Sequence, residues 1–350
     1  MSHDNDPRAP QSGLSHVRGT TDGALSRRTV HALLAEAARR WQARDAAVFL
    51  EQRLRYTWQQ LHDEVEAVAA GLWALGVRRG DRVGIWSPNR AEWLATQFAT
   101  ARIGAILVNI NPAYRLSELE YALDKSGVSL LVSAAAFKSS NYLGMLQNLG
   151  AGQASGRLPA LHTVVRMGDE PTAGMRNWRE LTSLGRERLH ALPAESLLEC
   201  DDAINIQFTS GTTGAPKGAM HVHGAVVAHA ATALYALDLH EDDIFWCTAD
   251  PGWVTGTSYG VIAPLVTGVT SVVVEAEFDA QTWYGVLERE KVSVWYTAPT
   301  AIRMMMKLGA DAVRAYQLPA LRFMASVGEP LNPEAVVWGQ EAFGLPFHDN

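Results

Sequence analysis

Hydrophobic positions in the first half of the chain alternate between helical spacing and short buried runs. Apolar residues three and four apart over 30–41 predict a helix, and the run 46–50 predicts a strand. Capping-box patterns occur at Thr57-Trp-Gln-Gln60 and Ser117-Glu-Leu-Glu120. The alternation predicts further helices over 57–75, 91–103 and from 117 onward, and strands over 82–86, 105–110 and 129–133. Because strands and helices alternate, the pattern indicates βαβ crossovers and a mainly parallel sheet.

The second half repeats this alternation. It predicts strands over 203–208, 244–248, 270–274, 292–296 and 323–327, and helices over 222–237, 258–266, 280–290 and 301–307. Residues 150–199 hold one clear strand, 163–166, and are expected to form a surface excursion or subdomain junction. The predicted fold class is α/β with doubly wound, mainly parallel sheets. Residues 1–28 lack periodic apolar positions and are expected to be a disordered tail, which leaves 29–350 as the folded domain.

Composition narrows the function classes. The 350 residues are 47% hydrophobic and 19% charged with a net charge of −7, which argues against disorder and against a nucleic-acid or anionic-membrane surface. Cys200 and Cys247 are too few for a disulfide framework and lack the spacing of a zinc site. The apolar stretch 225–237 is too short to span a bilayer, and the first residues are charged where a signal peptide is apolar. We expect a cytoplasmic protein with a small-molecule partner and no membrane insertion.

A loop rich in glycine, threonine and lysine follows the predicted strand 203–208. Its sequence is Gln207-Phe-Thr-Ser-Gly-Thr-Thr-Gly-Ala-Pro-Lys-Gly218, and a helical pattern follows within a few residues. The loop combines flexible glycines, hydroxyl donors and one cation, which suits the oxygens of a polyphosphate. These residues are Gly211, Gly214 and Gly218; Thr209, Ser210, Thr212 and Thr213; and Lys217. A Walker A loop is excluded because Lys217 follows Pro216 and precedes Gly218.

This loop resembles the phosphate-binding signature of the AMP-forming acyl- and aryl-CoA synthetases, the adenylate-forming superfamily. The similarity runs from about residue 30 to the end of the chain. Gly80-Asp-Arg-Val-Gly-Ile-Trp-Ser-Pro-Asn89, Asn111-Pro-Ala-Tyr114 and Glu118-Leu-Glu-Tyr121 resemble the N-terminal subdomain of fatty-acyl-CoA ligases. The resemblance implies an N-terminal adenylation domain that uses ATP, Mg²⁺ and CoA, with Thr209 and Lys217 as catalytic groups at the phosphates.

A second motif, Cys247-Thr-Ala-Asp-Pro-Gly-Trp-Val-Thr-Gly-Thr-Ser-Tyr259, follows a short predicted strand. From the residues alone, Trp253 and Val254 offer an apolar wall and Thr255 a hydroxyl donor, although for Trp253 taken alone core packing is the favoured interpretation, because the chain has 11 Trp. The string is similar to the acetate-pocket motif of acetyl-CoA synthetases, as are Trp295-Tyr-Thr-Ala-Pro-Thr-Ala-Ile-Arg303 and Ser326-Val-Gly-Glu-Pro-Leu-Asn-Pro333.

That similarity assigns further site residues. It implies that Trp253, Val254, Thr255, Ala298 and Val327 contact the acyl group or CoA. It implies that the nucleotide is bound by the loop residues above and by Gly328, Glu329, Pro330, Asp349 and Asn350. No resident metal site is predicted, because His221 and His223 have no carboxylate or cysteine in register and are expected to pack at the entry to a helix. Met304-Met-Met306 is expected to fill the core.

The resemblance implies a two-step ligase reaction. A carboxylate attacks the α-phosphorus of ATP to form an acyl-adenylate and pyrophosphate, and the thiol of CoA then displaces AMP. Acetate or another short acid is the expected substrate, with a medium-chain fatty acid as the alternative. A non-catalytic nucleotide- or acyl-binding fragment is a third hypothesis. The chain stops where acetyl-CoA synthetases continue into a small C-terminal lid domain, so we expect a truncated chain with impaired turnover.

Overall fold

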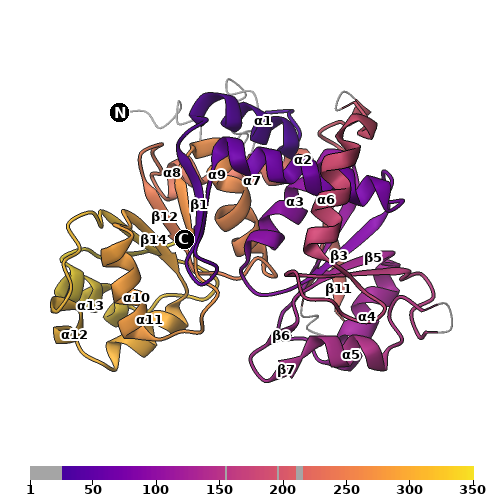
Figure 1. Ribbon diagram of the computed structural model, residues 1–350. Helices are drawn as coiled ribbons and strands as arrows, with labels where there is room; N and C mark the ends of the chain where they lie inside the picture. Colours follow the sequence, from indigo (N-terminus) through magenta and orange to yellow (C-terminus); the bar gives the residue numbers. More distant parts are fainter. Residues whose placement is uncertain (1–25, 154–155, 195–196, 210–215) are drawn as a thin grey trace, which may run out of the picture.

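Two seven-stranded sheets form the framework of the protein in a computed structural model that describes residues 26–153, 156–194, 197–209 and 216–350 (Figure 1). Sheet A has the strand order β16-β15-β14-β12-β13-β1-β2 and sheet B the order β11-β10-β4-β3-β5-β8-β9. The strands of sheet A are β1 (Asp45–Phe49), β2 (Leu54–Thr57), β12 (Ile244–Cys247), β13 (Thr270–Val273), β14 (Val294–Thr297), β15 (Phe323–Ser326) and β16 (Phe347–Asp349). Those of sheet B are β3 (Arg82–Trp86), β4 (Ile106–Ile110), β5 (Leu130–Ser133), β8 (Thr163–Arg166), β9 (Arg176–Asn177), β10 (Ala203–Thr209) and β11 (Lys217–Val222).

Strand direction in both sheets is parallel except at one edge. Only the pairs β1–β2 and β10–β11 are antiparallel, and every other neighbouring pair is parallel. A small hairpin joins β6 (Ala136–Phe137) to β7 (Ser140–Asn141). The doubly wound α/β fold expected from the alternating pattern is therefore confirmed.

Helices fill the space between the sheets and cover their outer faces. Helices α1, α2, α3, α7 and α9 lie between the sheets, α10 to α13 lie outside sheet A, and α4 and α5 lie outside sheet B (Figure 1). The helices are α1 (Val30–Trp41), α2 (Trp58–Ala74), α3 (Ala91–Ile103), α4 (Leu116–Ser126), α5 (Tyr142–Asn148), α6 (Trp178–Arg188), α7 (His223–Ala231), α8 (Ala233–Ala236), α9 (Ala263–Thr267), α10 (Ala280–Arg289), α11 (Pro299–Met306), α12 (Asp311–Arg314) and α13 (Pro333–Phe343). A 3-10 turn, η3 (Leu189–Ala191), follows α6, and a π-helical segment, η5 (Gly256–Ile262), precedes α9. None of the helices in the described residues is both long and apolar enough to cross a bilayer.

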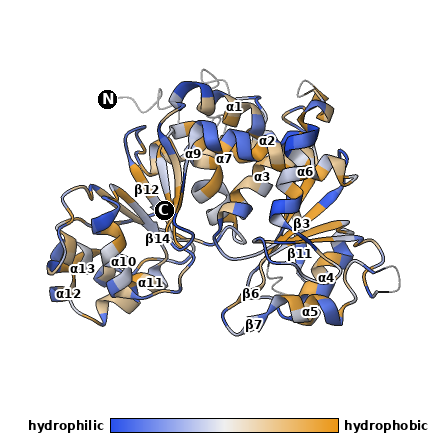
Figure 2. Ribbon diagram, viewed as in Figure 1, coloured by the Kyte–Doolittle hydropathy of each residue, from blue (hydrophilic) through white to orange (hydrophobic). Residues whose placement is uncertain are grey.

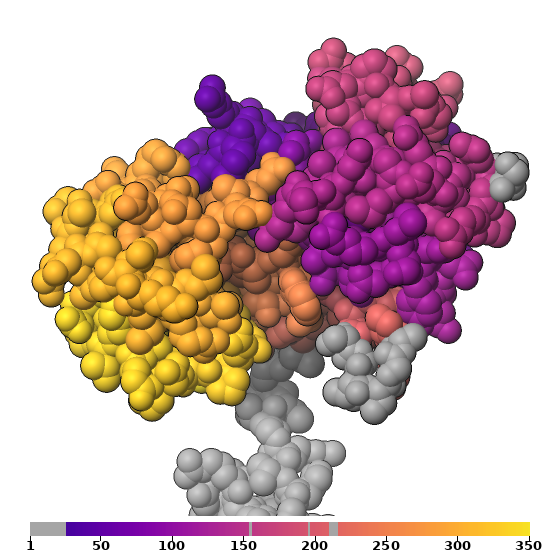
Figure 3. Space-filling model, turned by 90° about the horizontal axis from the view of Figure 1, so that it is seen from below, coloured from indigo at the N-terminus to yellow at the C-terminus, as the bar shows by residue number. Residues whose placement is uncertain are grey.

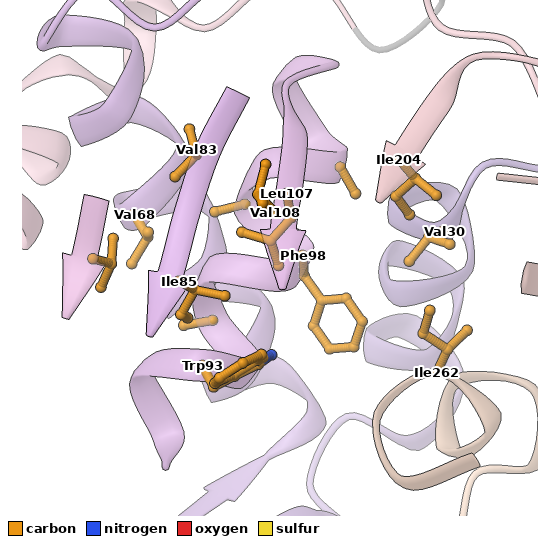
Figure 4. Close-up of a cluster of buried hydrophobic side chains, with 14 of the residues drawn as sticks. Val30, Val68, Val83, Ile85, Trp93, Phe98, Leu107, Val108, Ile204 and Ile262 are labelled. Atoms are coloured by element: carbon orange, nitrogen blue, oxygen red, sulfur yellow. The ribbon is translucent and has the colours of Figure 1, made fainter. Parts of the chain in front are cut away.

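Strands that are buried on both faces separate two hydrophobic clusters. Phe245, Val294 and Tyr296 of sheet A contribute to a central cluster, whereas the alternate residues Trp246 and Trp295 face α10, α11 and α13. Such strands carry continuous apolar runs, which explains why the sequence pattern found them. Figure 2 shows the apolar colouring along both sheets, and Figure 4 shows part of the central cluster, with side chains from β3, α3, β4, β10, α1 and η5.

Four sequence expectations need correction. The predicted helix 222–237 is confirmed over His223–Ala231 and Ala233–Ala236 but is interrupted at Thr232, and strand β11, which precedes it, was not predicted. The predicted cap at Ser117 is displaced: the backbone N–H of Arg115 donates to Glu118 Oε2 at 2.9 Å. The region 150–199 contains α6, whose capping box at Asn177 was missed. Met305 is buried, but Met304 is 43% exposed and does not fill the core.

Close contact between α2 and α6 depends on two glycines. A Cβ atom at Gly185 would lie 1.7 Å from the carbonyl oxygen of Ala67, and one at Gly71 would lie 2.4 Å from that of Leu181. Because these neighbours are backbone atoms, neither helix accepts a side chain without moving apart. The helix found in 150–199 therefore packs one face, with Leu181, Thr182 and Gly185 buried, closely against α2, while its other face is exposed.

We expect Gly185→Ala to lower the free energy of unfolding by about 3 kcal/mol, through overpacking between α2 and α6. The matched control is Gly285→Ala in α10, where a Cβ atom would meet nothing within 4 Å. The control should raise the free energy of unfolding by about 0.5–1 kcal/mol, because alanine has the higher helix propensity. Urea unfolding followed by circular dichroism measures both. Equal effects of the two variants would contradict the proposed close packing.

Candidate active site

The candidate site residues that the structure describes lie at or just beyond the carboxyl ends of strands. Thr209 ends β10, Ala298 follows β14, Val327 follows β15, and Asp349 ends β16. Residues 250–257, which we call the pocket segment, follow β12. In open α/β sheets the ligand crevice lies outside the carboxyl ends of the strands. The arrangement therefore places these residues where a ligand is expected.

A β-hairpin carries the described ends of the phosphate loop. Thr209 and Lys217 are paired across β10 and β11, and the Thr209 hydroxyl donates to the Lys217 carbonyl oxygen at 3.4 Å. The Tyr121 hydroxyl of α4 donates to the Pro216 carbonyl oxygen at 3.1 Å, which ties the hairpin to that helix. Both Thr209 and Lys217 are exposed. The predicted site residues Ser210, Gly211, Thr212, Thr213 and Gly214 lie outside the described residues.

The pocket segment is a tight turn set by Asp250. The Asp250 carboxylate accepts the backbone N–H of Gly252 at 3.0 Å, and its carbonyl oxygen accepts that of Trp253 at 2.9 Å. Gly256 approaches Asp250 so closely that a Cβ atom there would lie 2.2 Å from the Asp250 carbonyl oxygen. Trp253 is 53% exposed and Val254 46% exposed, so the core-packing alternative for Trp253 is wrong. The turn instead presents two apolar side chains on the surface.

Burial changes the ionisation of two groups near the pocket segment. Desolvation raises the pKa of Asp250 from 3.8 to about 7, although the Gly252 N–H and the charge of Lys138 lower it. Desolvation also raises the pKa of the Cys247 thiol, to about 12. The thiol is therefore protonated at neutral pH and is a poor nucleophile. Neither group was identified as a functional candidate from the sequence.

Hydrogen bonds join the strand ends of sheet A into one edge. The Thr248 and Thr297 hydroxyls are 2.8 Å apart, and the Val327 N–H donates to the Thr297 carbonyl oxygen at 3.1 Å. Asp349 accepts from the Ser326 hydroxyl at 3.1 Å and from the Leu331 N–H at 3.2 Å. Asn350 Oδ1 accepts from the Tyr296 hydroxyl at 2.8 Å. The structure thus brings the predicted residues of sheet A together.

The turn after β15 has a backbone that favours glycine. Gly328 has φ of +94°, a left-handed conformation that other residues rarely adopt, and Pro330 is exposed beside it. Glu329 accepts a hydrogen bond from the Thr300 hydroxyl at 2.6 Å and pairs with Arg303. The Thr300 hydrogen bond and the Arg303 charge hold the Glu329 pKa below its usual range. Its side chain is therefore engaged by α11, leaving the backbone and Pro330 as the exposed parts of this turn.

Two cavities flank the pocket segment. One has a volume of about 40 Å³ and is largely apolar, lined by Cys247, Pro251, Gly256 and Gly260 and by residues of α3 that include Trp93 and Phe98. The other, of about 160 Å³, lies between the β6–β7 hairpin and sheet A and is lined by Lys138, Asp250, Glu275 and Trp283 among others. Figure 3 shows the two halves of the chain, magenta and orange to yellow, meeting along this face.

Two side chains of sheet B contact the pocket segment from strands whose sequence pattern is that of buried core strands. Gln207 Nε2 donates to the Gly252 carbonyl oxygen at 2.7 Å, and Asn109 Nδ2 donates to Thr257 Oγ1 at 3.0 Å. The signal in the sequence is an amide side chain within an otherwise apolar strand, which sequence reasoning did not use. These contacts connect the strand that carries the phosphate loop to the pocket segment.

The contacts of the buried histidines indicate structural roles. His223 begins α7, is fully buried, and accepts the backbone N–H of Val30 through Nδ1 at 3.1 Å, as expected for packing at a helix entry. Burial lowers its pKa to about 4. Elsewhere His31, His62 and Glu66 place ligand atoms within 4.8 Å of one another, a group that sequence analysis missed. Glu66 Oε1 there pairs with His31 Nε2 at 2.8 Å and Arg102 Nε at 3.0 Å, which favours a buried charge network.

Comparison with known proteins gives consistent results. A family model described as AMP-binding enzyme matches residues 34–349. The chain is 36% identical to the acetyl-coenzyme A synthetase of Bacillus subtilis (strain 168), over 84% of this chain and 49% of that protein. It is 35% identical to the mitochondrial medium-chain acyl-CoA ligase ACSF2 of Danio rerio, over 95% of this chain and 56% of that protein. The chain therefore spans about half the length of these curated relatives.

A solved structure with a similar fold is the anthranilate CoA ligase AuaEII in complex with anthranoyl-AMP. It superposes with a TM-score of 0.81 and 25% sequence identity, over 93% of this chain and 60% of that one.

The raised pKa of Asp250 predicts a pH-dependent stability. Between about pH 4 and the folded-state pKa of about 7, the folded protein keeps a proton that the unfolded chain has lost. This contribution to the free energy of unfolding therefore falls as pH rises through that window, by up to about 1.4 kcal/mol per pH unit. Asp250→Asn should abolish that part of the decline, measured as the difference between the two proteins in urea unfolding from pH 5 to 8. Parallel profiles would contradict a protonated Asp250.

Proposed function

The chain belongs to the AMP-binding enzyme family, and on this premise we propose that it carries the acid-activating site of an AMP-forming acid–CoA ligase. The observation that carries the proposal is the 2.7 Å hydrogen bond from Gln207 to the Gly252 carbonyl oxygen. Through it, the strand that ends at Thr209 is joined to the segment that presents Trp253 and Val254. A phosphate-binding hairpin and an apolar pocket are then neighbours, as a reaction between a carboxylate and a nucleotide requires.

In this proposal Thr209 and Lys217 act on the phosphates. Both side chains are exposed at facing ends of β10 and β11, so they are free to turn toward an anion. The Thr209 hydroxyl would donate to a phosphate oxygen, and the Lys217 ammonium would neutralise charge that develops as pyrophosphate leaves. Magnesium bound with ATP would supply further charge neutralisation. The donor set at the hairpin ends fits a polyphosphate, and no protein nucleophile is needed.

The acid and the nucleotide base would lie on the sheet A edge. We assign Trp253, Val254 and Val327 to the wall of the acyl site and Thr255 to a carboxylate or thioester oxygen. Ala298 at the start of α11 would border the path of CoA. Adenine would pack on Gly328 and Pro330, and the nucleotide site would also include Glu329, Asp349 and Asn350. The fit of the turn to a purine follows from the backbone of Gly328 and the exposed ring of Pro330.

The apolar cavity meets the pocket segment at Pro251 and Gly256, and its lining does not include Trp253, Val254 or Val327. In this proposal it takes only the end of the alkyl chain of the acid, and its size supports a short acid. Its volume of about 40 Å³ accommodates only about three water-sized groups, at roughly 10–15 Å³ each. The methyl group of acetate or the ethyl group of propionate fits such a space, whereas an octanoyl tail requires side chains to move. We therefore propose acetate or propionate as the substrate.

A medium-chain acid is the second candidate. ACSF2 of Danio rerio is named a medium-chain acyl-CoA ligase, and its similarity to this chain covers 95% of the chain. The apolar cavity adjoins the buried side of the pocket segment, so an extended tail would point into it. Val261 lines the cavity and is half-buried, which makes it the position at which a larger side chain would shorten an acyl site.

Pyrophosphate exchange into ATP tests the acid-activating step alone. We expect exchange that depends on an acid, with acetate or propionate preferred over octanoate. Lys217→Met should lower kcat/KM by about 10²- to 10³-fold, because one charged donor to the phosphates is lost. The matched control Lys125→Met removes an exposed lysine of α4 and should leave exchange unchanged. If none of the acids supports exchange but calorimetry shows that ATP binds, the result would favour the non-catalytic binding module instead.

Val261→Phe tests which acid enters the cavity. If a medium-chain tail lies there, the variant should lose exchange with octanoate and keep exchange with acetate, because only the longer acid needs the filled space. If the substrate is short, the preference for acetate should already be present in the unmodified chain and persist in the variant. Preferred exchange with octanoate in both proteins would contradict the assignment of this cavity to the acyl group.

A further inference from the structure

Two buried amide side chains stand side by side beneath the pocket segment. Asn109 of β4 and Gln207 of β10 are register partners in sheet B, and they are 1% and 4% exposed. Gln207 donates to the Gly252 carbonyl oxygen at 2.7 Å. Asn109 donates at 3.0 Å to the Thr257 hydroxyl, which in turn donates to the Pro251 carbonyl oxygen at 2.7 Å. The pair therefore holds both ends of the pocket segment from one sheet.

This arrangement is costly for stability. The oxygen atoms of both amides, Gln207 Oε1 and Asn109 Oδ1, are buried and have no hydrogen-bond partner among the described residues. An unpaired buried acceptor destabilises a fold, so apolar side chains at these two strand positions would serve packing better. Hydrophobic residues would not bind Gly252 or Thr257, however, and would leave the pocket segment held only by its own turn and by packing.

A second amide on the same strand shows what a purely structural arrangement looks like. Asn205, two residues before Gln207, exchanges two hydrogen bonds with Gln97 of α3, at 2.9 and 3.3 Å. Both amides of that pair are buried, and each uses its oxygen and its nitrogen. Gln207 differs because only its donor is used, and the group that it binds is the backbone of the pocket segment.

We propose that Gln207 and Asn109 are positioning residues that set the pocket segment relative to the phosphate-binding hairpin, and so align the acid with the nucleotide. Gln207 is two residues from Thr209, and its partner Gly252 is next to Trp253. One rigid strand thus places both reactants. The proposal rests on the proposed function for its catalytic consequence, but the hold on the pocket segment is a property of the chain itself.

Two substitutions at Gln207 remove the donor in different ways. Gln207→Leu takes away the whole amide, including the unpaired oxygen, so its loss and gain in stability should nearly cancel. Gln207→Glu keeps the shape, but the ionised carboxylate repels the Gly252 carbonyl oxygen, and only the protonated form donates to it. The control is the double variant Asn205→Leu with Gln97→Leu, which removes the satisfied amide pair from the same strand.

Hydrogen–deuterium exchange measures the hold directly. We expect protection of the backbone amides in 250–257 to fall about tenfold in Gln207→Leu, the equivalent of one net hydrogen bond. The double control should leave that segment unchanged. Gln207→Glu should lose protection more as pH rises than the unmodified chain does. Unchanged protection in Gln207→Leu, or an equal loss in the control, would overturn the proposal whether or not the chain is an enzyme.

Kinetics then tests the catalytic consequence. In pyrophosphate exchange, Gln207→Leu should raise KM for acetate and lower kcat by about 10-fold or more, because the acid is misaligned. KM for ATP should stay within about twofold, since the backbone pairing of β10 with β11 is retained. Lost protection with unaltered acetate kinetics would overturn the positioning role. Absence of pyrophosphate exchange in the unmodified chain would instead count against the proposed function. The hydrogen–deuterium protection of residues 250–257 would then decide the inference.

Discussion

Close backbone approach between the two sheets is the constraint on which the candidate site depends. Gly252 leaves so little room that a Cβ atom would lie 2.8 Å from the Pro112 ring, which follows β4 of sheet B. Within the pocket segment itself, a Cβ atom at Gly256 would lie 2.2 Å from the Asp250 carbonyl oxygen. Contacts this short are possible only because neither residue has a side chain. The Gly252 contact brings the pocket segment of sheet A against the turn that follows β4 of sheet B, and the Gly256 contact keeps the pocket segment itself compact.

Once the segments are in contact, their polar groups must be satisfied without water. The Gly252 and Pro251 carbonyl oxygens accept from Gln207 and Thr257, and the Gly252 N–H is bound by Asp250. The low-dielectric setting that makes these bonds effective also disfavours charge, which is why the Asp250 pKa rises. The interior of the site is thus polar but largely uncharged, whereas the exposed Lys217 lies at its edge.

The two sheets contribute different surfaces to the candidate site, which is how one domain would serve an acid and a nucleotide together in the proposed function. Sheet B ends in the antiparallel hairpin β10–β11, an exposed platform of hydroxyl and ammonium groups. Sheet A ends in turns that present Trp253 and Val254 and the left-handed backbone of Gly328. Since the two edges are joined by side-chain amides, a substrate bound at one edge meets a fixed geometry at the other.

Patterns formed by neighbouring residues allowed the sequence to predict most secondary-structure elements and the family of this protein. The alternating apolar runs predicted most strands and helices, and the Thr57 capping box placed the start of α2 where the structure has it. The loop at 207–218 and the motif at 247–259 predicted the family, which the comparisons confirm. These features depend on neighbours along the chain, so a single sequence carries them.

Tertiary structure alone decided what depends on residues far apart. Strand β11 pairs across the loop with β10, a strand that the local pattern of residues 217–222 did not predict. The fit of Gly185 against α2 and the shift in Asp250 both require burial by distant segments. The same holds for Gln207, whose hydrogen-bond partner Gly252 is 45 residues away in the chain. Its role comes from packing two sheets together, a long-range event that local sequence patterns do not encode.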